Sequence, residues 1–218
     1  MSAYTLYIGN KNYSSWSLRP WLAMKVAGIP FEEKLILLFD DDWKANIAKV
    51  SPSARVPVLV DGGQTIWETM AILEYLAERH PDKGLWPEGR EARAMARSVS
   101  NEMHAGFTAL RGNMPMNIRK SHPGKGMGEG VAEDIARVSE IWNDCRKRFG
   151  ADGPFLFGKF CNADAMFAPV VSRLTTFAVE LDAVSAAYRD AVQALPEMIE
   201  WSDAGRAEPW TVSEDEID

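Results

Sequence analysis

The chain has 218 residues, of which 46% are hydrophobic and 25% are charged, as is usual for a globular protein with a sizeable core. Its formal net charge of -7 argues against a nucleic-acid partner, because nucleic-acid recognition requires a basic surface. Only two cysteines are present, which argues against a disulfide framework and favours a reducing, cytoplasmic location. The sequence shows no signal-peptide pattern and no apolar run of membrane-spanning length, so we expect no membrane partner.

Four segments within the first eighty residues are typical of β-strands, since aromatic and β-branched side chains are frequent in them. These segments are residues 4–8, 31–38, 55–61 and 64–67, the last two joined by a turn at Gly62 and Gly63. A short helix or an irregular segment is expected at residues 40–50, and a helix at residues 69–79. With a further helix after the first strand, the order β-α-β-α-β-β-α predicts a mixed four-stranded sheet with helices packed on it.

The start of the first helix is predicted from Pro20. Proline is tolerated in the first turn of a helix but breaks the hydrogen-bond ladder further in. We therefore expect the helix to begin at about Ser17, with Ser17 as its N-cap, and to end near Gly28. Ser14 and Ser15 then lie in the polar loop just before the helix.

The rest of the chain predicts helices. Proline and glycine interrupt residues 81–90, which we interpret as a linker before an all-helical region at residues 91–218. A helix with a buried stripe is expected where apolar side chains recur three or four residues apart, at Met103, Phe107, Leu110 and Met114. Further helices are expected at residues 131–149, 163–178 and 185–195, and a disordered acidic tail at residues 213–218.

Three stretches carry a resemblance to a known family. They are RVPVLVDGGQTIWETMAILEYLAE, FLFGKFCNADAMFAPVV and SSWSLRPW. The chain resembles the cytosolic glutathione transferases, and its serine loop resembles the signature of their zeta class. The resemblance implies a thioredoxin-like glutathione-binding domain at residues 1–80 and a helical domain at residues 91–218 that forms the cosubstrate pocket. It also implies a homodimer, with glutathione as cosubstrate and a role in detoxification.

The resemblance implies that the peptide bond between Val56 and Pro57 is cis and that the Val56 backbone pairs with glutathione like a short added strand. A cis bond before proline costs little, although a trans proline at an edge strand is an ordinary alternative. Glu68 and Thr69 begin a helix, and a helix N-terminus attracts anions. Thr69 is expected to cap the helix and bind a carboxylate, and Glu68 to pair with an ammonium group, unless they form a plain helix start.

The serine loop suggests how a thiol is activated. The thiolate is the nucleophile of thiol transfer, and a hydroxyl that donates a hydrogen bond to the sulfur lowers the thiol pKa. By the resemblance, Ser14 takes this role and Ser15 assists, while Ser17 is structural. Trp16 stands where the zeta signature has cysteine, which puts a carried-over isomerase activity in doubt.

Several other polar side chains are weaker candidates. Tyr13 and Tyr7 are rival hydroxyls, and Tyr7 reads more readily as a core aromatic residue. Arg19 matches the arginine of the signature and is a candidate to lie near the thiolate or to hold a carboxylate in the cosubstrate pocket, with a structural salt bridge as the alternative. Lys44 and Arg55 are candidates for the glycyl carboxylate of glutathione, unless they are plain surface charges.

The helical region offers candidates for the cosubstrate pocket. Arg111 and Asn117 suit an acidic or polar cosubstrate, although a solvated helix face is the ordinary alternative for such residues. His104 and Thr108 are further candidates, because they fall on the same helix face as Arg111, next to the apolar stripe. The three histidines are scattered and form no metal-binding pattern, so we expect no metal.

Asp164 is expected to close a hydrogen-bonded box at a helix start. The family usually has serine or threonine at the position of Cys161, so Asn162 is an alternative cap. Cys145 and Cys161 read as buried apolar residues rather than nucleophiles.

The sequence leaves three functional hypotheses. The first is a glutathione transferase that acts on a small electrophile, with isomerase or peroxidase activity as variants. The second is a non-catalytic binding protein on the same scaffold, since one fold serves many functions. The third is a thiol-disulfide or peroxide reductase, and the absence of a cysteine in the first loop argues against its disulfide form.

Overall fold

The computed structural model of the chain describes residues 4–40 and 42–217. Its sheet contains β1 (Tyr4–Ile8), β2 (Phe31–Leu35), β3 (Val58–Asp61) and β4 (Gln64–Trp67), in the order β2-β1-β3-β4. β1 and β2 are parallel, whereas β3 is antiparallel to both β1 and β4. The predicted mixed four-stranded sheet is therefore confirmed.

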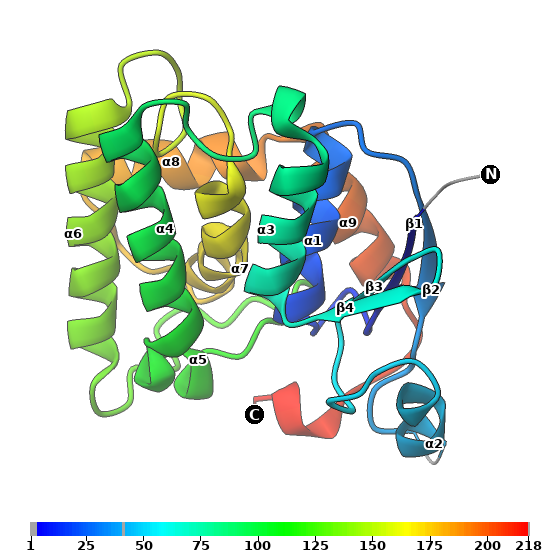
Figure 1. Ribbon diagram of the computed structural model, residues 1–218. Helices are drawn as coiled ribbons and strands as arrows, with labels where there is room; N and C mark the ends of the chain where they lie inside the picture. The colour runs from blue at the N-terminus through cyan, green and yellow to red at the C-terminus, as the bar shows by residue number, and fades with distance from the viewer. Residues whose placement is uncertain (1–3, 41, 218) are drawn as a thin grey trace.

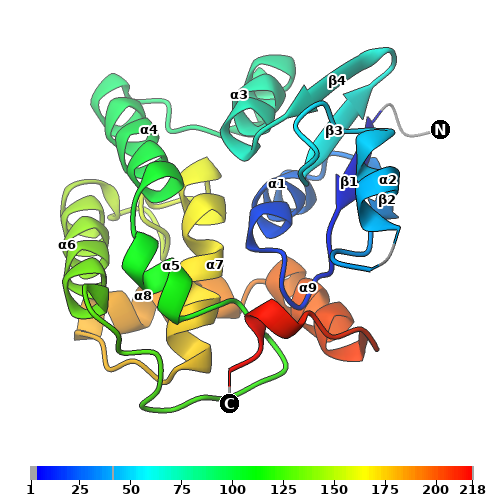
Figure 2. The same ribbon diagram turned by 90° about the horizontal axis from the view of Figure 1, so that it is seen from below.

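Two helices cover one face of this sheet. α1 (Ser15–Val26) and α3 (Thr69–Arg79) lie between the sheet and most of the helices that follow them in the chain (Figures 1 and 2). Alternate residues of β1 are buried, as expected for a strand with one covered face. The short α2 (Trp43–Ala48) lies apart from α1 and α3, at the lower right of Figure 1. Residue 41, within the predicted 40–50 segment, lies outside the described residues.

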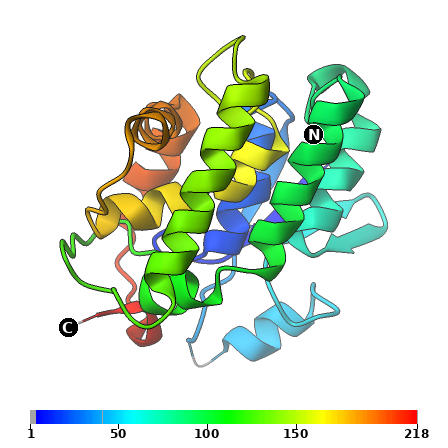
Figure 3. The same ribbon diagram turned by 90° about the vertical axis from the view of Figure 1, so that its left-hand side faces the viewer.

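The second part of the chain is helical. It contains η1 (Pro81–Lys83), α4 (Arg90–Ala105), α5 (Thr108–Asn113), α6 (Val131–Phe149), α7 (Asn162–Thr176), α8 (Ala183–Gln193), α9 (Pro196–Ala207) and η2 (Ser213–Asp215). α6 and α4 cross the front of the view in Figure 3. Within the described ranges, no helix is both long and apolar enough to cross a membrane.

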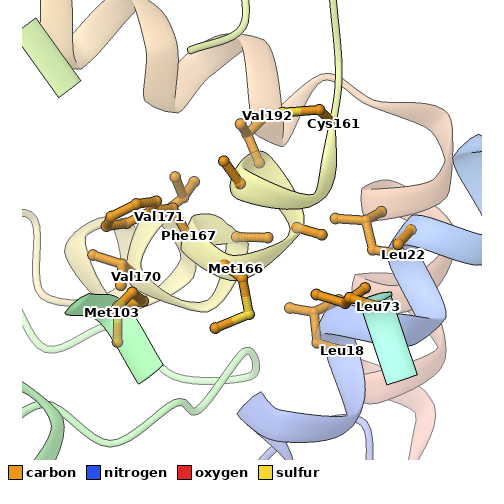
Figure 4. Packing of buried hydrophobic residues seen from close by; sticks show 14 of the residues in the cluster. Leu18, Leu22, Leu73, Met103, Cys161, Met166, Phe167, Val170, Val171 and Val192 are labelled. Atoms are coloured by element: carbon orange, nitrogen blue, oxygen red, sulfur yellow. The ribbon is translucent and has the colours of Figure 1, made fainter. Parts of the chain in front are cut away.

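α7 is the central helix, and every one of its residues except Thr175 is buried. Figure 4 shows Met166 of α7 beside Leu18 of α1 and Leu73 of α3, while Val170 faces Met103 of α4. One continuous apolar core therefore joins the sheet region to the helical region. Burial of this area is the main stabilising contribution, and it holds the two regions in a fixed relation.

The predicted apolar stripe is buried, but it does not lie on one helix. α4 ends at Ala105 and α5 begins at Thr108, and between them Phe107 has a left-handed φ of 56°. A Cβ on Gly106 would lie 2.9 Å from the carbonyl oxygen of Glu102, so this glycine permits the break. The single-helix prediction was wrong because the spacing of apolar residues continues across the break.

Two strands are shorter than predicted. β2 ends at Leu35 because the chain then turns, and the Leu38 N–H bonds the side chain of Asn10 at 2.9 Å instead of a strand. β3 begins at Val58, since Pro57 has no N–H to contribute to the ladder.

The C-terminal end departs most from the prediction. The structure places η2 at Ser213–Asp215 and buries Val212, so the expected disordered tail was wrong for residues 213–217. Residue 218 lies outside the described residues. α9 was not predicted at all, although Pro196 at its first position is compatible with a helix start. The tail is ordered because its polar groups bond to residues far away in the sequence.

Asp164 closes the predicted box at the start of α7. Its carboxylate accepts hydrogen bonds from the backbone N–H groups of Cys161 at 2.8 Å and Leu156 at 3.0 Å. The N-cap position belongs to Cys161, whose side chain takes the place of a hydroxyl. Asn162 is the first helical residue rather than the cap, and its amide donates to the carbonyl of Leu73.

Candidate active site

A cleft of about 250 Å³ opens where the sheet region meets α4 and α5. Its walls come from the N-terminal ends of α1 and α3, from the turn before β3, and from the ends of α4 and α5. The lining residues are Trp16, Ser53, Arg55, Val56, Pro57, Glu68, Thr69, His104 and Arg111. The fold thus brings together most of the residues that the sequence singled out for binding, from both parts of the chain.

The turn before β3 forms one wall. The bond between Val56 and Pro57 is cis, as predicted. The hydroxyl of Ser51 accepts from the N–H of Arg55 at 3.1 Å and donates to the carbonyl of the same residue at 2.7 Å, which fixes the entry to the turn. Among the described residues, the Val56 backbone has no hydrogen-bond partner. Its peptide group is therefore available to an extended ligand.

The start of α3 forms a second wall. Glu68 precedes the helix with a φ of 68°, an unusual conformation for a residue with a side chain, and its carboxylate is exposed. Thr69 is the first helical residue, and its hydroxyl donates to the carbonyl of Trp16 at 3.2 Å. That carbonyl lacks its usual helical donor, because Pro20 has no N–H. Thr69 was predicted to cap α3, but its side chain ties α3 to α1 instead.

We expect Thr69→Val to weaken the junction of α1 and α3. The valine methyl replaces a buried donor, so the Trp16 carbonyl loses its partner at a cost of about 1–3 kcal/mol. Urea unfolding of the variant measures this loss. Thr65→Val on β4 is the control, because Thr65 is less buried and its hydroxyl is not part of this junction. Equal stability of Thr69→Val and the wild type would contradict the assigned hydrogen bond.

The serine loop, residues 10–15, leads into α1. The helix begins at Ser15 rather than Ser17, so Pro20 lies beyond the first turn and the prediction from it was wrong. Ser17 lies inside the helix, where its hydroxyl accepts from the Gly9 N–H at 3.0 Å and from the Ser14 hydroxyl at 2.8 Å. Ser14 and Ser15 are 7% and 9% exposed, and neither lines the cleft, although Ser15 directly precedes Trp16 in the cleft wall.

The two rival tyrosines are engaged elsewhere. The Tyr13 hydroxyl donates to Glu216 at 2.6 Å and accepts from Arg119 at 2.6 Å. Tyr7 is half-buried on the sheet face opposite Leu6, with Lys34 over its ring, so it is not the core aromatic that was expected. Neither tyrosine lines the cleft.

A cationic cluster surrounds Trp16. The guanidinium groups of Arg19 and Arg111 lie 4.2 Å and 4.9 Å from the centre of its ring, and the ring of His104 meets it edge-on at 5.1 Å. Arg19 is 2% exposed and donates to the carbonyls of Met166 and Ser15. Among the described residues it forms no salt bridge, so the structural ion pair considered for it was wrong.

Burial alters the charge balance of this cluster. It is the main cause that lowers the pKa of Arg19, which the nearby charges of Arg173 and Arg111 lower further. Burial also lowers the pKa of Arg111. The pKa of His104 is lowered by burial and by both arginines, against an opposing effect of Glu68, so this imidazole is neutral at pH 7. The cluster is thus cationic through arginine, with a neutral histidine beside it.

Six predicted site residues are not among the residues that line the cleft. Three of them, described above, are Ser14, Ser15 and Arg19, and the others are Lys44, Thr108 and Asn117. Lys44 is exposed on α2, and Thr108 is exposed at the start of α5. Asn117 is buried, where it accepts from Asn12 at 2.9 Å and donates to Glu216 at 3.0 Å. Its role is therefore structural.

Sequence reasoning missed two lining residues and judged the cysteines correctly. Trp16 was considered only as a substitution for the cysteine of the zeta signature. Its position between Ser15 and Ser17 was a signal that it lines the site. No pattern marks Ser53. Cys145 and Cys161 are free and buried, and burial raises the pKa of Cys145 to about 12 and that of Cys161 well above its usual value. Neither thiol ionises at neutral pH.

Comparison with known proteins agrees with this geometry. Residues 13–79 match the family model described as glutathione S-transferase, N-terminal domain. A maleylacetoacetate isomerase of Dictyostelium discoideum is 37% identical over 166 residues, which are 74% of this chain and 72% of that relative. The chain belongs to the glutathione S-transferase family. The predicted thioredoxin-like sheet region followed by a helical region is accordingly confirmed as the glutathione S-transferase fold.

Other relatives in the family match over stretches of different length. A probable maleylacetoacetate isomerase of Caenorhabditis elegans is 37% identical over 105 residues, so the match spans about half of each protein, 48%. A zeta-class glutathione S-transferase of Euphorbia esula is 27% identical over 158 residues, 71% of this chain and 66% of that relative. The resemblance of the serine loop to the zeta class agrees with these names.

Solved glutathione transferases share the whole fold. A glutathione transferase homologue from Burkholderia with bound glutathione superposes with a TM-score of 0.72 at 24% identity, covering 94% of this chain and 99% of that one. Glutathione transferase Omega 3C from Trametes versicolor gives a TM-score of 0.69 at 17% identity, covering 91% and 88%. Both the helical region and the sheet region thus follow the fold of the family.

Proposed function

We propose that the chain is a glutathione transferase that binds glutathione in this cleft and stabilises its thiolate for attack on a small electrophile. One observation carries the proposal: the cis Val56-Pro57 turn and the N-terminal ends of α1 and α3 meet in a single cleft. A free peptide group and two positive helix ends suit a ligand that combines a peptide, carboxylates and a thiol.

Each part of glutathione has a complementary group in the cleft. The Val56 peptide group would pair with the cysteinyl residue. The backbone N–H groups at the start of α3 would bind the γ-glutamyl carboxylate, and Glu68 would pair with the ammonium group beside it. Arg55 is assigned to the glycyl carboxylate, because it lines the cleft and Lys44 does not.

The thiol would lie beside the start of α1, where the Ser14 hydroxyl donates to the sulfur. A donated hydrogen bond and a helix N-terminus both favour the thiolate, which is the reactive form. Ser17 supports this role, since it can donate to Ser14 once Ser14 turns its proton toward the sulfur. Ser14 forms no covalent bond in this mechanism, and Ser15 is the auxiliary hydroxyl.

The second substrate is proposed to be a small anionic electrophile. Arg111 lines the cleft beside Trp16, and Arg19 lies against the same ring. Within the described ranges no carboxylate pairs with either guanidinium group, so an incoming anion would supply the missing countercharge. His104 adds a neutral imidazole that can exchange a proton with the substrate.

We expect the effect of Arg111→Gln to depend on the charge of the electrophile. The variant should raise KM about tenfold for an electrophile that carries a carboxylate, the loss expected for one charged hydrogen bond, and leave a neutral electrophile unaffected. Steady-state kinetics with a matched carboxylate and amide pair measures this. Arg206→Gln, an exposed arginine on α9, is the control. An equal loss for both electrophiles would remove Arg111 from substrate recognition.

A second candidate function is glutathione-dependent isomerisation of an unsaturated carboxylate. The cationic cluster favours it, together with relatives named maleylacetoacetate isomerase. The thiolate would add to the double bond, the resulting single bond would rotate, and loss of the same thiolate would restore the double bond. No oxidant or reductant is consumed. Trp16, in place of the signature cysteine, adds bulk beside the sulfur and is the feature that weighs against this candidate.

The test is glutathione binding by calorimetry, with ultraviolet titration of the thiolate in the complex and product analysis with both substrate types. Binding with a lowered thiol pKa is expected. A product that contains glutathione supports the transferase, and an isomer with unchanged mass supports the isomerase. Absence of binding would leave the non-catalytic scaffold as the better hypothesis.

Other expectations from the sequence and from the family resemblance stay predictions. They are a domain boundary between residues 1–80 and 91–218 with a linker at 81–90, a cytoplasmic location, a homodimer, peroxidase activity and a role in detoxification. Sedimentation of the purified chain tests the homodimer directly.

A further inference from the structure

The C-terminal segment, residues 208–217, crosses the serine loop. We call it the C-terminal strap. Its first residue, Glu208, accepts from two consecutive backbone N–H groups of the loop, those of Lys11 at 2.7 Å and Asn12 at 3.1 Å. Figure 2 shows the strap, drawn in red, passing beside the loop that leads into α1. One carboxylate thus holds two adjacent peptide groups just before Ser14.

Arg119 also links the strap to the serine loop. Its guanidinium group donates to the carbonyls of Glu208 and Trp210, both at 2.7 Å, and to the Tyr13 hydroxyl at 2.6 Å. Tyr13 in turn donates to Glu216, at the far end of the strap, at 2.6 Å. The residue directly before Ser14 is therefore held between the two ends of the strap.

The carboxylate of Glu216 keeps its negative charge in this network. Burial alone would raise the pKa of Glu216, but hydrogen bonds from Tyr13 and Asn117, with the charges of Lys120 and Arg119, bring it below its usual value. Glu216 is therefore ionised at neutral pH, and the Tyr13 hydroxyl donates to a full negative charge.

α9 completes the support. The indole N–H of Trp201 donates to the Lys11 carbonyl at 2.9 Å. A Cβ on Gly205 would lie 3.1 Å from the Asn12 nitrogen, so the helix backbone approaches the loop closely. The ring of Trp201 also meets the ring of Trp21 of α1 edge-on, with 5.0 Å between their centres. The loop, α9 and the strap are thus joined by direct contacts just before the start of α1.

None of the groups that hold the loop lines the cleft. They cannot touch a substrate there, yet they hold the three residues that precede the proposed thiolate donor, Lys11, Asn12 and Tyr13. Donor geometry matters strongly, because a misplacement of about 1 Å can cost about a hundredfold in rate. Besides its contribution to packing, the network therefore affects the reaction rate through the position of the Ser14 hydroxyl.

We propose that Glu208 and Arg119 are positioning residues, which hold the serine loop so that the Ser14 hydroxyl is aimed at the glutathione sulfur. The proposal rests on the proposed function, since it concerns the same thiol. Glu208→Gln keeps the size of the side chain but leaves one amide donor facing a loop N–H. Tyr13→Phe removes only the hydroxyl that links Arg119 to Glu216.

The experiment compares these variants with the wild type by thermal unfolding, calorimetric binding of glutathione, thiolate titration of the complex and steady-state kinetics. We expect both variants to fold, to bind glutathione with an affinity near that of the wild type, and to raise the thiol pKa by about one unit. The expected fall in kcat is about tenfold, with little change in KM for glutathione. Glu214→Gln, an exposed carboxylate of the same strap, is the matched control and should change none of these.

Two results would overturn the proposal. One is a folded Glu208→Gln with the thiol pKa and kcat of the wild type, because a structural role alone lowers only the unfolding temperature. The other, if Glu208→Gln does not fold, is the same unchanged behaviour in Tyr13→Phe. A wild type that binds no glutathione, or leaves its thiol pKa unchanged, would instead remove the proposed function itself, so the two failures are distinguishable.

Discussion

Ser14→Ala is expected to raise the thiol pKa of bound glutathione toward its value in free solution and to lower kcat about a hundredfold at neutral pH. The reason is the loss of the hydroxyl proposed to donate to the sulfur, and removal of one such donor typically costs a hundredfold or more. Glutathione affinity should change little, because its other contacts lie at Val56 and the start of α3. Ultraviolet titration of the complex and steady-state rates measure both quantities.

Matched serine variants sharpen this test. Ser17→Ala should give a smaller effect of the same sign, because Ser17 is bonded to Ser14 at 2.8 Å and not assigned to the sulfur. Ser15→Ala should raise the thiol pKa much less than Ser14→Ala does, because Ser15 is only the auxiliary hydroxyl. The rate defect of Ser14→Ala should shrink as the pH is raised above the thiol pKa, since hydroxide then supplies the thiolate. A normal thiol pKa in Ser14→Ala with a raised one in Ser15→Ala would reassign the role to Ser15.

Asp164→Ala is expected to destabilise the fold by about 2–6 kcal/mol. The substitution leaves two buried N–H groups, of Leu156 and Cys161, without an acceptor, and each costs about 1–3 kcal/mol. α7 begins at this site and forms the centre of the core, so the loss reaches both parts of the chain. Urea unfolding at neutral pH measures it. Asp144→Ala, an exposed aspartate on α6, is the control and should cost much less.

The same carboxyl makes stability depend on pH. Burial is the main cause that raises the pKa of Asp164 to about 6 in the folded chain, against hydrogen bonds that lower it. The unfolded chain titrates near 3.8, so the stabilisation associated with this proton is present below about pH 4 and is lost as the pH rises toward 6. Asp164→Asn lacks this titration. The free energy of unfolding of this variant should therefore rise relative to that of the wild type between pH 4 and pH 6. If the two free energies change with pH in parallel over this range, the raised pKa of Asp164 is contradicted.

Local patterns in the sequence determined much of the fold and part of the site. The bounds of β1, β4, α3 and α6 follow from residue type, spacing and turn chemistry, which act over a few residues. The start of α3 beside Glu68 was predicted in the same way, whereas the cis Val56-Pro57 bond was expected from the resemblance, since the residues alone left a trans bond open. These features are local, because proline, glycine and helix ends impose their geometry on immediate neighbours.

Tertiary structure decided the remainder. The start of α1 at Ser15 depends on a Thr69 hydroxyl, 53 residues away, which satisfies the carbonyl that Pro20 leaves free. The order of the tail depends on Tyr13 and Asn117, which were read as site candidates and bond to Glu216 instead. The packing of the two regions placed Arg111 against Trp16, and burial there lowers the pKa of Arg111. Such pairs are far apart in the chain, and neither residue type nor spacing encodes which distant partner a buried polar group will find.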